Sequence, residues 1–105
     1  MKTYLMPKYD SRQSFYNKAV VEHRGNRITL YSYNVKVAEI HDGKLRLFNA
    51  WDYSSTTLRH TKEFLKQNGF VADTKAQIEK DYINNWGVLP MVFLVLFLII
   101  LVFEG

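Results

Sequence analysis

The C-terminal part of the chain contains an apolar run that constrains what the rest can be. From Tyr82 to Phe103 no residue is charged, a run of 22 positions. As an α-helix this run would be about 33 Å long, enough for a bilayer core of roughly 30 Å. From Val88 to Phe103 every side chain is apolar, so the run lacks the polar face that a surface helix presents. The sequence therefore predicts a single C-terminal transmembrane helix over residues 82–103.

Two alternatives to a membrane helix fit less well. A domain of about eighty residues is too small to surround a helix that is apolar on all sides. A strand would show alternation, and the run shows none. Pro90 either occupies the first turn of a shorter helix or kinks a longer one, and the sequence leaves both readings open.

The distribution of charge gives the orientation of the predicted helix. All 14 Lys and Arg precede it, and only Glu104 and Gly105 follow it. Tyr82 and Trp86 stand where aromatic side chains meet the membrane interface. By the positive-inside rule we expect a single-pass, tail-anchored protein of the cell membrane, with its N-terminal domain in the cytoplasm and its C-terminus outside.

The segment before the run, residues 1–81, is predicted to be one soluble domain. It holds 14 basic and nine acidic residues, a surplus of five positive charges, which favours anionic partners. The absence of cysteine excludes disulfides and Cys-type zinc sites. No apolar stretch precedes Pro7 and Lys8, so no cleaved signal peptide is expected.

The first half of this domain reads as strands and the second half as helices. Alternating apolar residues predict strands over 18–23, 27–33, 35–41 and 44–49, joined by turns such as Asp42-Gly43. Hydroxyl residues 54–57 and Gly69 bracket a first helix, and Thr74 with Gln77 opens a second from Lys75 to about Tyr82. We expect an α+β fold, a small antiparallel meander of about four strands packed with two helices, with Phe64 and Leu65 directed at the sheet.

The stretch Tyr53-Ser-Ser-Thr-Thr-Leu-Arg-His-Thr-Lys-Glu-Phe-Leu-Lys-Gln-Asn-Gly-Phe70 resembles the signature of a family of small uncharacterised proteins. That family is found in phages, plasmids and genomes of Gram-positive, lactic-acid-type bacteria. Residues 9–16 and 31–34 are similar to its other recurrent stretches. The resemblance covers residues 6–82, and the apolar tail lies outside the usual pattern. It implies a mobile-element accessory protein and brings no assigned activity.

The candidate binding face is basic and aromatic. Arg59, Lys62 and Lys66 fall on one side of the first predicted helix and could contact anionic lipid or a partner. The N-terminal arm interleaves bases and rings, and Arg12, Tyr9 and Tyr16 could instead clamp single-stranded nucleic acid. A solvated helix face accounts for the basic residues equally well.

Catalytic and metal-binding patterns are absent from the sequence. His23, His41 and His60 are widely spaced and have no acidic cluster beside them. The hydroxyls of residues 54–57 next to His60 are explained by helix capping, because no nucleophile elbow or glycine loop accompanies them. We expect no enzyme activity, no cofactor and no metal.

These observations predict a non-enzymatic, membrane-anchored accessory protein of a phage or other mobile element. It would bind an unidentified protein partner at the cytoplasmic membrane face, with the lipid bilayer as its second contact. The alternative is a nucleic-acid or nucleoprotein-binding module tethered to the membrane. A holin-like lesion former is disfavoured, because the tail lacks a small-residue or polar face for helix packing.

Overall fold

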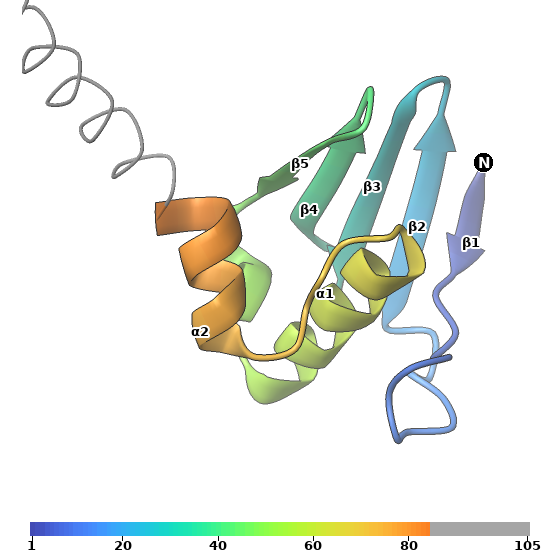
Figure 1. Cartoon of the computed structure of the whole chain (residues 1–105). Helices are drawn as coiled ribbons and strands as arrows, with labels where there is room; N and C mark the ends of the chain where they lie inside the picture. The colour runs from blue at the N-terminus through green and yellow to red at the C-terminus, as the bar shows by residue number, and fades with distance from the viewer. Residues whose placement is uncertain (85–105) are drawn as a thin grey trace, which may run out of the picture.

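A computed structural model of the protein describes residues 1–84 (Figure 1). Its strands are β1 (Lys2–Tyr4), β2 (Ala19–Arg24), β3 (Arg27–Ser32), β4 (Val35–His41) and β5 (Lys44–Leu47). Its helical elements are the 3₁₀ turn η1 (Asn49–Asp52), α1 (Ser55–Gln67), the short α2 (Lys75–Ile78) and the π-helical turn η2 (Glu79–Asn84).

The five strands form one antiparallel sheet in the order β1-β2-β3-β4-β5. Two-residue turns join β2 to β3, β3 to β4, and β4 to β5. The backbone turns through positive φ in each of them, at Gly25, at Tyr33 and Asn34, and at Asp42 and Gly43. Such turns match the right-handed twist of the paired strands, which is why short hairpins use them. The register shifts between Leu30 and Tyr31, so that two successive residues of β4, Val37 and Ala38, are both buried.

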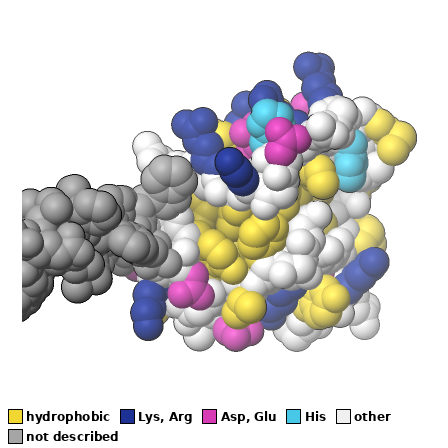
Figure 2. Space-filling view, turned by 45° about the horizontal axis from the view of Figure 1, so that its top comes forward, with side chains coloured by type: hydrophobic (Ala, Val, Ile, Leu, Met, Phe, Trp, Pro, Cys, Tyr) yellow, Lys and Arg dark blue, Asp and Glu magenta, His cyan; other side chains and the backbone are white. Residues whose placement is uncertain are grey.

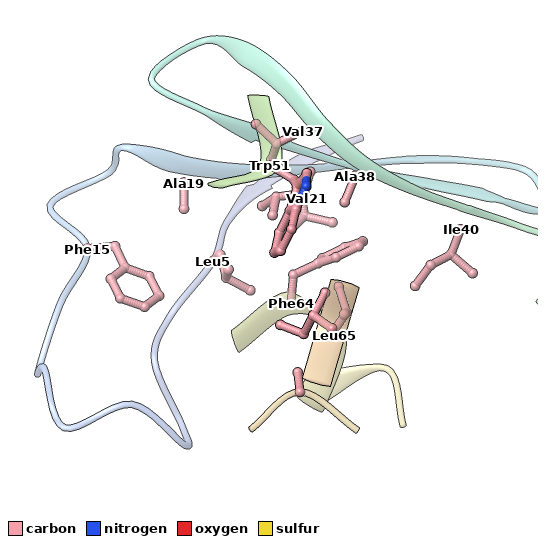
Figure 3. Packing of buried hydrophobic residues seen from close by; sticks show 13 residues of the cluster. Leu5, Phe15, Ala19, Val21, Val37, Ala38, Ile40, Trp51, Phe64 and Leu65 are labelled. Carbon is pink, nitrogen blue, oxygen red and sulfur yellow. The ribbon is translucent and has the colours of Figure 1, made fainter. Parts of the chain in front are cut away.

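Both helices lie on the same side of the sheet (Figure 1). Between the two layers, Phe64 and Leu65 of α1 are fully buried in a cluster that includes Val21, Ala38 and Ile40 of the strands (Figure 3). Trp51 of η1 closes the cluster beside β4, where it is 5% exposed. Other hydrophobic side chains packed on this cluster, among them Leu45, Leu47 and Tyr82, are only partly buried. Figure 2 shows a patch of hydrophobic atoms on one face of the molecule.

The predicted signals for the ends of α1 and for the start of α2 are confirmed. The hydroxyl of Ser54 accepts a hydrogen bond from the backbone N–H of Thr57 (3.1 Å), and Gly69 follows α1 at φ +86°. Thr74 caps α2 in the same way by accepting from the N–H of Gln77 (3.1 Å). The second predicted helix, however, is α-helical only to Ile78 and then widens into η2.

The predicted sheet of about four strands is wrong by one strand. The missing strand, β1, has three residues that are all exposed, so it carries no apolar alternation. It is held by pairing with β2, where Thr3 lies opposite Val21, and by the terminal ammonium of Met1, which donates to the carbonyl of His23 (2.9 Å). A strand stabilised by its backbone in this way leaves little trace in the sequence.

The predicted transmembrane helix is not supported by the structure. No helix within residues 1–84 is long and apolar enough to cross a membrane. The start of the predicted span belongs instead to η2, where Tyr82 and Ile83 pack against the core. The remainder, together with the predicted outer tail, lies outside the described residues. The error at Tyr82 has a physical reason, since an aromatic residue that anchors a small core looks the same in sequence as one at an interface.

Truncation of Phe64 tests the position of the core. Phe64→Ala removes a fully buried ring between sheet and helix, and we expect a loss of about 3–5 kcal/mol in the free energy of unfolding. Urea titration followed by circular dichroism measures it. Tyr53→Ala, at an 85% exposed ring, is the matched control and should change stability by less than about 0.5 kcal/mol. Equal midpoints for the two variants would contradict the packing described here.

Candidate functional site

The structure assembles the predicted binding face in part. Tyr9, Arg59, Lys62 and Lys66 line one shallow hollow of about 210 Å³ beside α1. Two of the predicted residues lie apart from it. Tyr16 is 75% exposed at a turn where its φ is +53°, and Arg12 meets Asp10 through its backbone N–H (2.9 Å).

Acidic groups neutralise much of this face. The guanidinium of Arg59 pairs with the carboxylate of Asp10 at 2.9 Å. Within residues 1–84, Lys62 and Lys66 form no salt bridge. Within the described residues, the basic side of α1 therefore consists of two unpaired lysines next to an ion pair, which is weak evidence for a site that binds an anionic ligand.

Glu63, which sequence reasoning passed over, is buried on α1 and binds the N-terminal loop. Its Oε1 accepts hydrogen bonds from the N–H groups of Tyr9 and Asp10, both at 2.9 Å. Its Oε2 accepts from the N–H of Lys8 at 3.0 Å and from the amide of Gln67 at 2.7 Å. Three successive backbone N–H groups that converge on one carboxylate form an anion-binding nest, and here the protein supplies its own anion. The loop at residues 8–10 is therefore fixed to the helix.

A second buried group, His60, lies on the next turn of α1. Its Nδ1 is 2.8 Å from the hydroxyl of Ser32, which also contacts the hydroxyl of Thr57 at 3.1 Å. Phe15 and Tyr33 flank the imidazole, with ring centroids at 4.6 and 5.8 Å. Burial lowers the pKa of His60 to about 4, against a smaller opposing effect of the Asp10 carboxylate. His60 is therefore neutral at physiological pH.

The pair of Ser32 and His60 is not arranged for nucleophilic chemistry. Both residues are buried, with Ser32 2% exposed and His60 fully enclosed. The imidazole contacts serine through Nδ1, and its Nε2 has no hydrogen-bond partner within the described residues. A catalytic histidine instead takes the proton from serine on one nitrogen and is oriented through the other. The arrangement links β3 to α1 and supports the packing there.

Beside this network lies an apolar hollow of about 470 Å³, here called the tyrosine hollow. Exposed side chains of Tyr33, Val35 and Tyr53 form its rim. Further lining comes from the partly or fully buried Val37 and Ala50, and from the hydroxyl residues of the neighbouring network, Ser32, Ser54 and Thr57. Ser54 and Thr57 are already paired, oxygen to oxygen, at 3.2 Å.

The face of the sheet opposite the helices, here called the open face, is basic and aromatic. Contacts between side chains place five cations on it. Arg24 and Arg27 approach Glu22 and Glu39 at 3.7 and 3.5 Å. Lys2 lies over the ring of Tyr31 at 5.8 Å from its centroid. Lys36 and Arg46 lie over Phe48, at 5.6 and 4.8 Å.

The sequence contained the signal for the open face. Outward positions of the strands alternate with core positions, so that Lys44, Arg46 and Phe48 flank the inward Leu45 and Leu47. The prediction concentrated on clusters along the chain. It missed cations that are far apart in sequence and become neighbours only through strand pairing.

Within the part of the chain that the structure describes, no group of three His, Asp or Glu is placed to hold a metal ion.

The predicted membrane-interface residue Tyr82 packs edge-on against Phe70, and its hydroxyl donates to the carbonyl of Val71 at 2.8 Å. Burial raises the pKa of the Tyr82 phenol, with the Asp81 charge as a second cause. Trp86 lies beyond the described residues. Contact with a bilayer or anionic lipid, and the cytoplasmic location, stay predictions.

Comparison with known proteins identifies the family. The profile of one family matches residues 3–80 of the chain. The chain belongs to DUF8033, a family of unknown function. The predicted likeness to an uncharacterised family is thereby confirmed at that level. The DUF8033 match contains Glu63, His60 and the tyrosine hollow, and all of the open face except Lys2. Neither a curated protein nor a solved structure matches the chain.

Glu63→Gln tests the nest. The amide keeps the shape of the side chain but replaces one acceptor oxygen with a donor that faces backbone N–H groups. Each hydrogen bond to a charged group contributes about 1.5–3 kcal/mol, so amide exchange at residues 8–10 should accelerate by about tenfold or more. Hydrogen exchange followed by NMR measures it. Exchange in the β2–β3 hairpin serves as the internal control, and unchanged protection at residues 8–10 would contradict the assignment.

His60 predicts an acid-sensitive stability. Because folding lowers its pKa from the ordinary 6.5 to about 4, the folded state favours the neutral ring. The contribution is complete above pH 6.5 and is lost as the pH falls toward 4. Between pH 7.5 and 5 we expect the free energy of unfolding to drop by about 2 kcal/mol. Urea titrations at both pH values measure the drop. The drop should largely vanish in His60→Gln. If the free energy of unfolding of this variant still falls by the same amount between the two pH values, other groups are responsible for it.

Proposed function

We propose that this DUF8033 protein is a non-enzymatic interaction module of a phage or other mobile element, which docks a protein partner at the tyrosine hollow. The observation that carries the proposal is the exposure of three large apolar side chains around one apolar hollow. Tyr33, Val35 and Tyr53 are 49%, 51% and 85% exposed. Clustered exposed apolar side chains mark binding surfaces on small proteins, and tyrosine is enriched among the residues that dominate interface energies.

The shape of the hollow supports an inserted side chain. Its volume of about 470 Å³ lies within the range of roughly 300–1,000 Å³ that suits a bound group. Val37 and Ala50 give it an apolar lining, and rigid elements hold them, namely β4 and η1. An apolar side chain of a partner would lose its contact with water there while the tyrosines cover it.

The chemistry of the lining supports binding rather than reaction. Apart from the phenol groups of Tyr33 and Tyr53 at the rim, its polar side chains are Ser32, Ser54 and Thr57. The hydroxyls of these three already bond to one another or to His60. Among the described residues, no charged side chain lines the hollow, so it offers no carboxylate, lysine or histidine as a general acid or base to a bound molecule. The mobile-element context rests on the resemblance of residues 53–70 to the family signature.

Site-specific photocrosslinking in native host cells tests the proposal. A photoreactive phenylalanine analogue at position 53 should capture one discrete protein. The same analogue at position 16, where the tyrosine is 75% exposed, should not capture that protein. Val35→Asp, which places a charge on the rim, should reduce capture by about tenfold or more, because burying an unpaired charge is costly.

Val71→Asp provides the matched control, since Val71 is 58% exposed and lies outside the hollow. It should leave capture at position 53 unchanged. The proposal would be overturned if the analogue captured the protein equally from positions 53 and 16, or if no discrete product formed. It would also be overturned if Val35→Asp left capture at position 53 unchanged. Capture of a small molecule in place of a protein, detected by mass spectrometry, would do so as well.

A further inference from the structure

We infer that the open face binds single-stranded nucleic acid, independently of the tyrosine hollow. Strand pairing gives the arrangement of this face. Lys2 lies opposite Glu22 across β1 and β2, and Glu39 lies opposite Arg46 across β4 and β5. Tyr4 lies opposite Val20, which in turn lies opposite Tyr31. The outward side chains therefore form rows that run across the sheet.

The first argument is charge. With Lys44, whose outward position follows from its pairing with His41, six cations and two carboxylates occupy the face, a surplus of four among the five excess positive charges of residues 1–84. Both carboxylates are already engaged, since Glu22 meets Arg24 and also accepts from the hydroxyl of Tyr31 (3.4 Å), and Glu39 meets Arg27. Lys2, Lys36 and Arg46 form no salt bridge within the described residues. They are available to phosphates.

The second argument is the placement of the rings. Tyr4 and Tyr31 line a hollow of about 460 Å³ together with Lys2, Thr3, Val20 and Asn34. Tyr4 is 58% exposed, and the ammonium of Lys2 stands over the Tyr31 ring. A planar base could stack on a tyrosine there while Lys2 contacts its phosphate and the amide of Asn34 reaches its edge.

Phe48 forms a second candidate stacking site on the same face, at the opposite edge of the sheet beside β5. The guanidinium of Arg46 and the ammonium of Lys36 both lie over its ring. Cations beside an aromatic ring suit single-stranded nucleic acid, because its bases can stack on the ring while its phosphates contact the cations. At about 4.8 Å between neighbouring strands, the edge at β5 lies roughly 10 Å from Tyr31 on β3 and roughly 19 Å from Tyr4 on β1. Sheet surfaces of known RNA-binding domains stack two or three bases.

The same features favour a single strand over a duplex or an acidic protein. Stacking needs unpaired bases, which a duplex does not present. An acidic peptide would use the cations and leave the tyrosines without a role. The N-terminal arm predicted from sequence contributes Lys2 and Tyr4 to this face, whereas Tyr9 and Arg12 belong to the loop held by Glu63.

Fluorescence anisotropy of the full chain with labelled dT12 and U12 oligonucleotides tests the inference. Kd should rise steeply with salt, as expected when cations release counterions from phosphates. Tyr4→Ala should raise Kd by about tenfold, the effect of losing one stacked base. Tyr9→Ala removes a ring that is 61% exposed on the other side of the molecule and should leave Kd unchanged.

A pair of charge reversals separates the open face from general electrostatics. Lys36→Glu with Arg46→Glu should raise Kd at least tenfold, whereas Lys62→Glu with Lys66→Glu, the same change in net charge on α1, should change it by less than about threefold. Circular dichroism checks that each variant is folded. The inference would be overturned if the two pairs had equal effects on Kd, or if the protein bound duplex DNA with equal affinity. It would also be overturned if polyglutamate at equal charge displaced the oligonucleotide fully, or if the protein did not bind the oligonucleotide at low salt.

Discussion

One carboxylate, that of Glu63, determines how the N-terminal third of this protein is arranged. Its two oxygens accept from three consecutive backbone N–H groups and from Gln67, so none of its hydrogen-bonding capacity is directed at solvent. Gln67 in turn donates to the carbonyl of Met6 (2.7 Å). The loop so fixed connects β1 to the segment that carries Phe15. Buried charge is tolerated only when it is fully hydrogen-bonded, and here that requirement forces the loop onto the helix.

The placement of that loop shapes both surfaces that the proposals use. It lies between β1 and β2, whose pairing brings Lys2 and Tyr4 to the open face. It also leads to Phe15, which packs against His60 and thereby supports Ser32 and Thr57 beneath the tyrosine hollow. One internal anchor thus serves two faces of the sheet. The sheet separates the two proposed binding surfaces.

The sequence predicted most of the fold and little of the site. Patterning located four of the five strands and the apolar side of α1, because Leu30, Ile40 and Phe64 recur at periods that burial imposes. It missed β1, whose stability comes from backbone pairing, and it assigned Tyr82 to a membrane interface although the residue packs on Phe70. Glu63 and His60 read as ordinary polar residues of an amphipathic helix. Their roles depend on partners 53 and 28 residues away, which no local pattern encodes.

The meander has a consequence for the order in which the chain assembles. Each of β2 to β5 pairs with its neighbour in sequence across a two-residue turn, so these contacts close very short loops. The contact of Glu63 with the N-terminal loop spans 53 to 55 residues, and closing that larger loop costs about 2 kcal/mol more in chain entropy. Topology of this kind favours early formation of the hairpins. We therefore expect the contact between Glu63 and the N-terminal loop to form late in folding, after the hairpins and the helix that it joins.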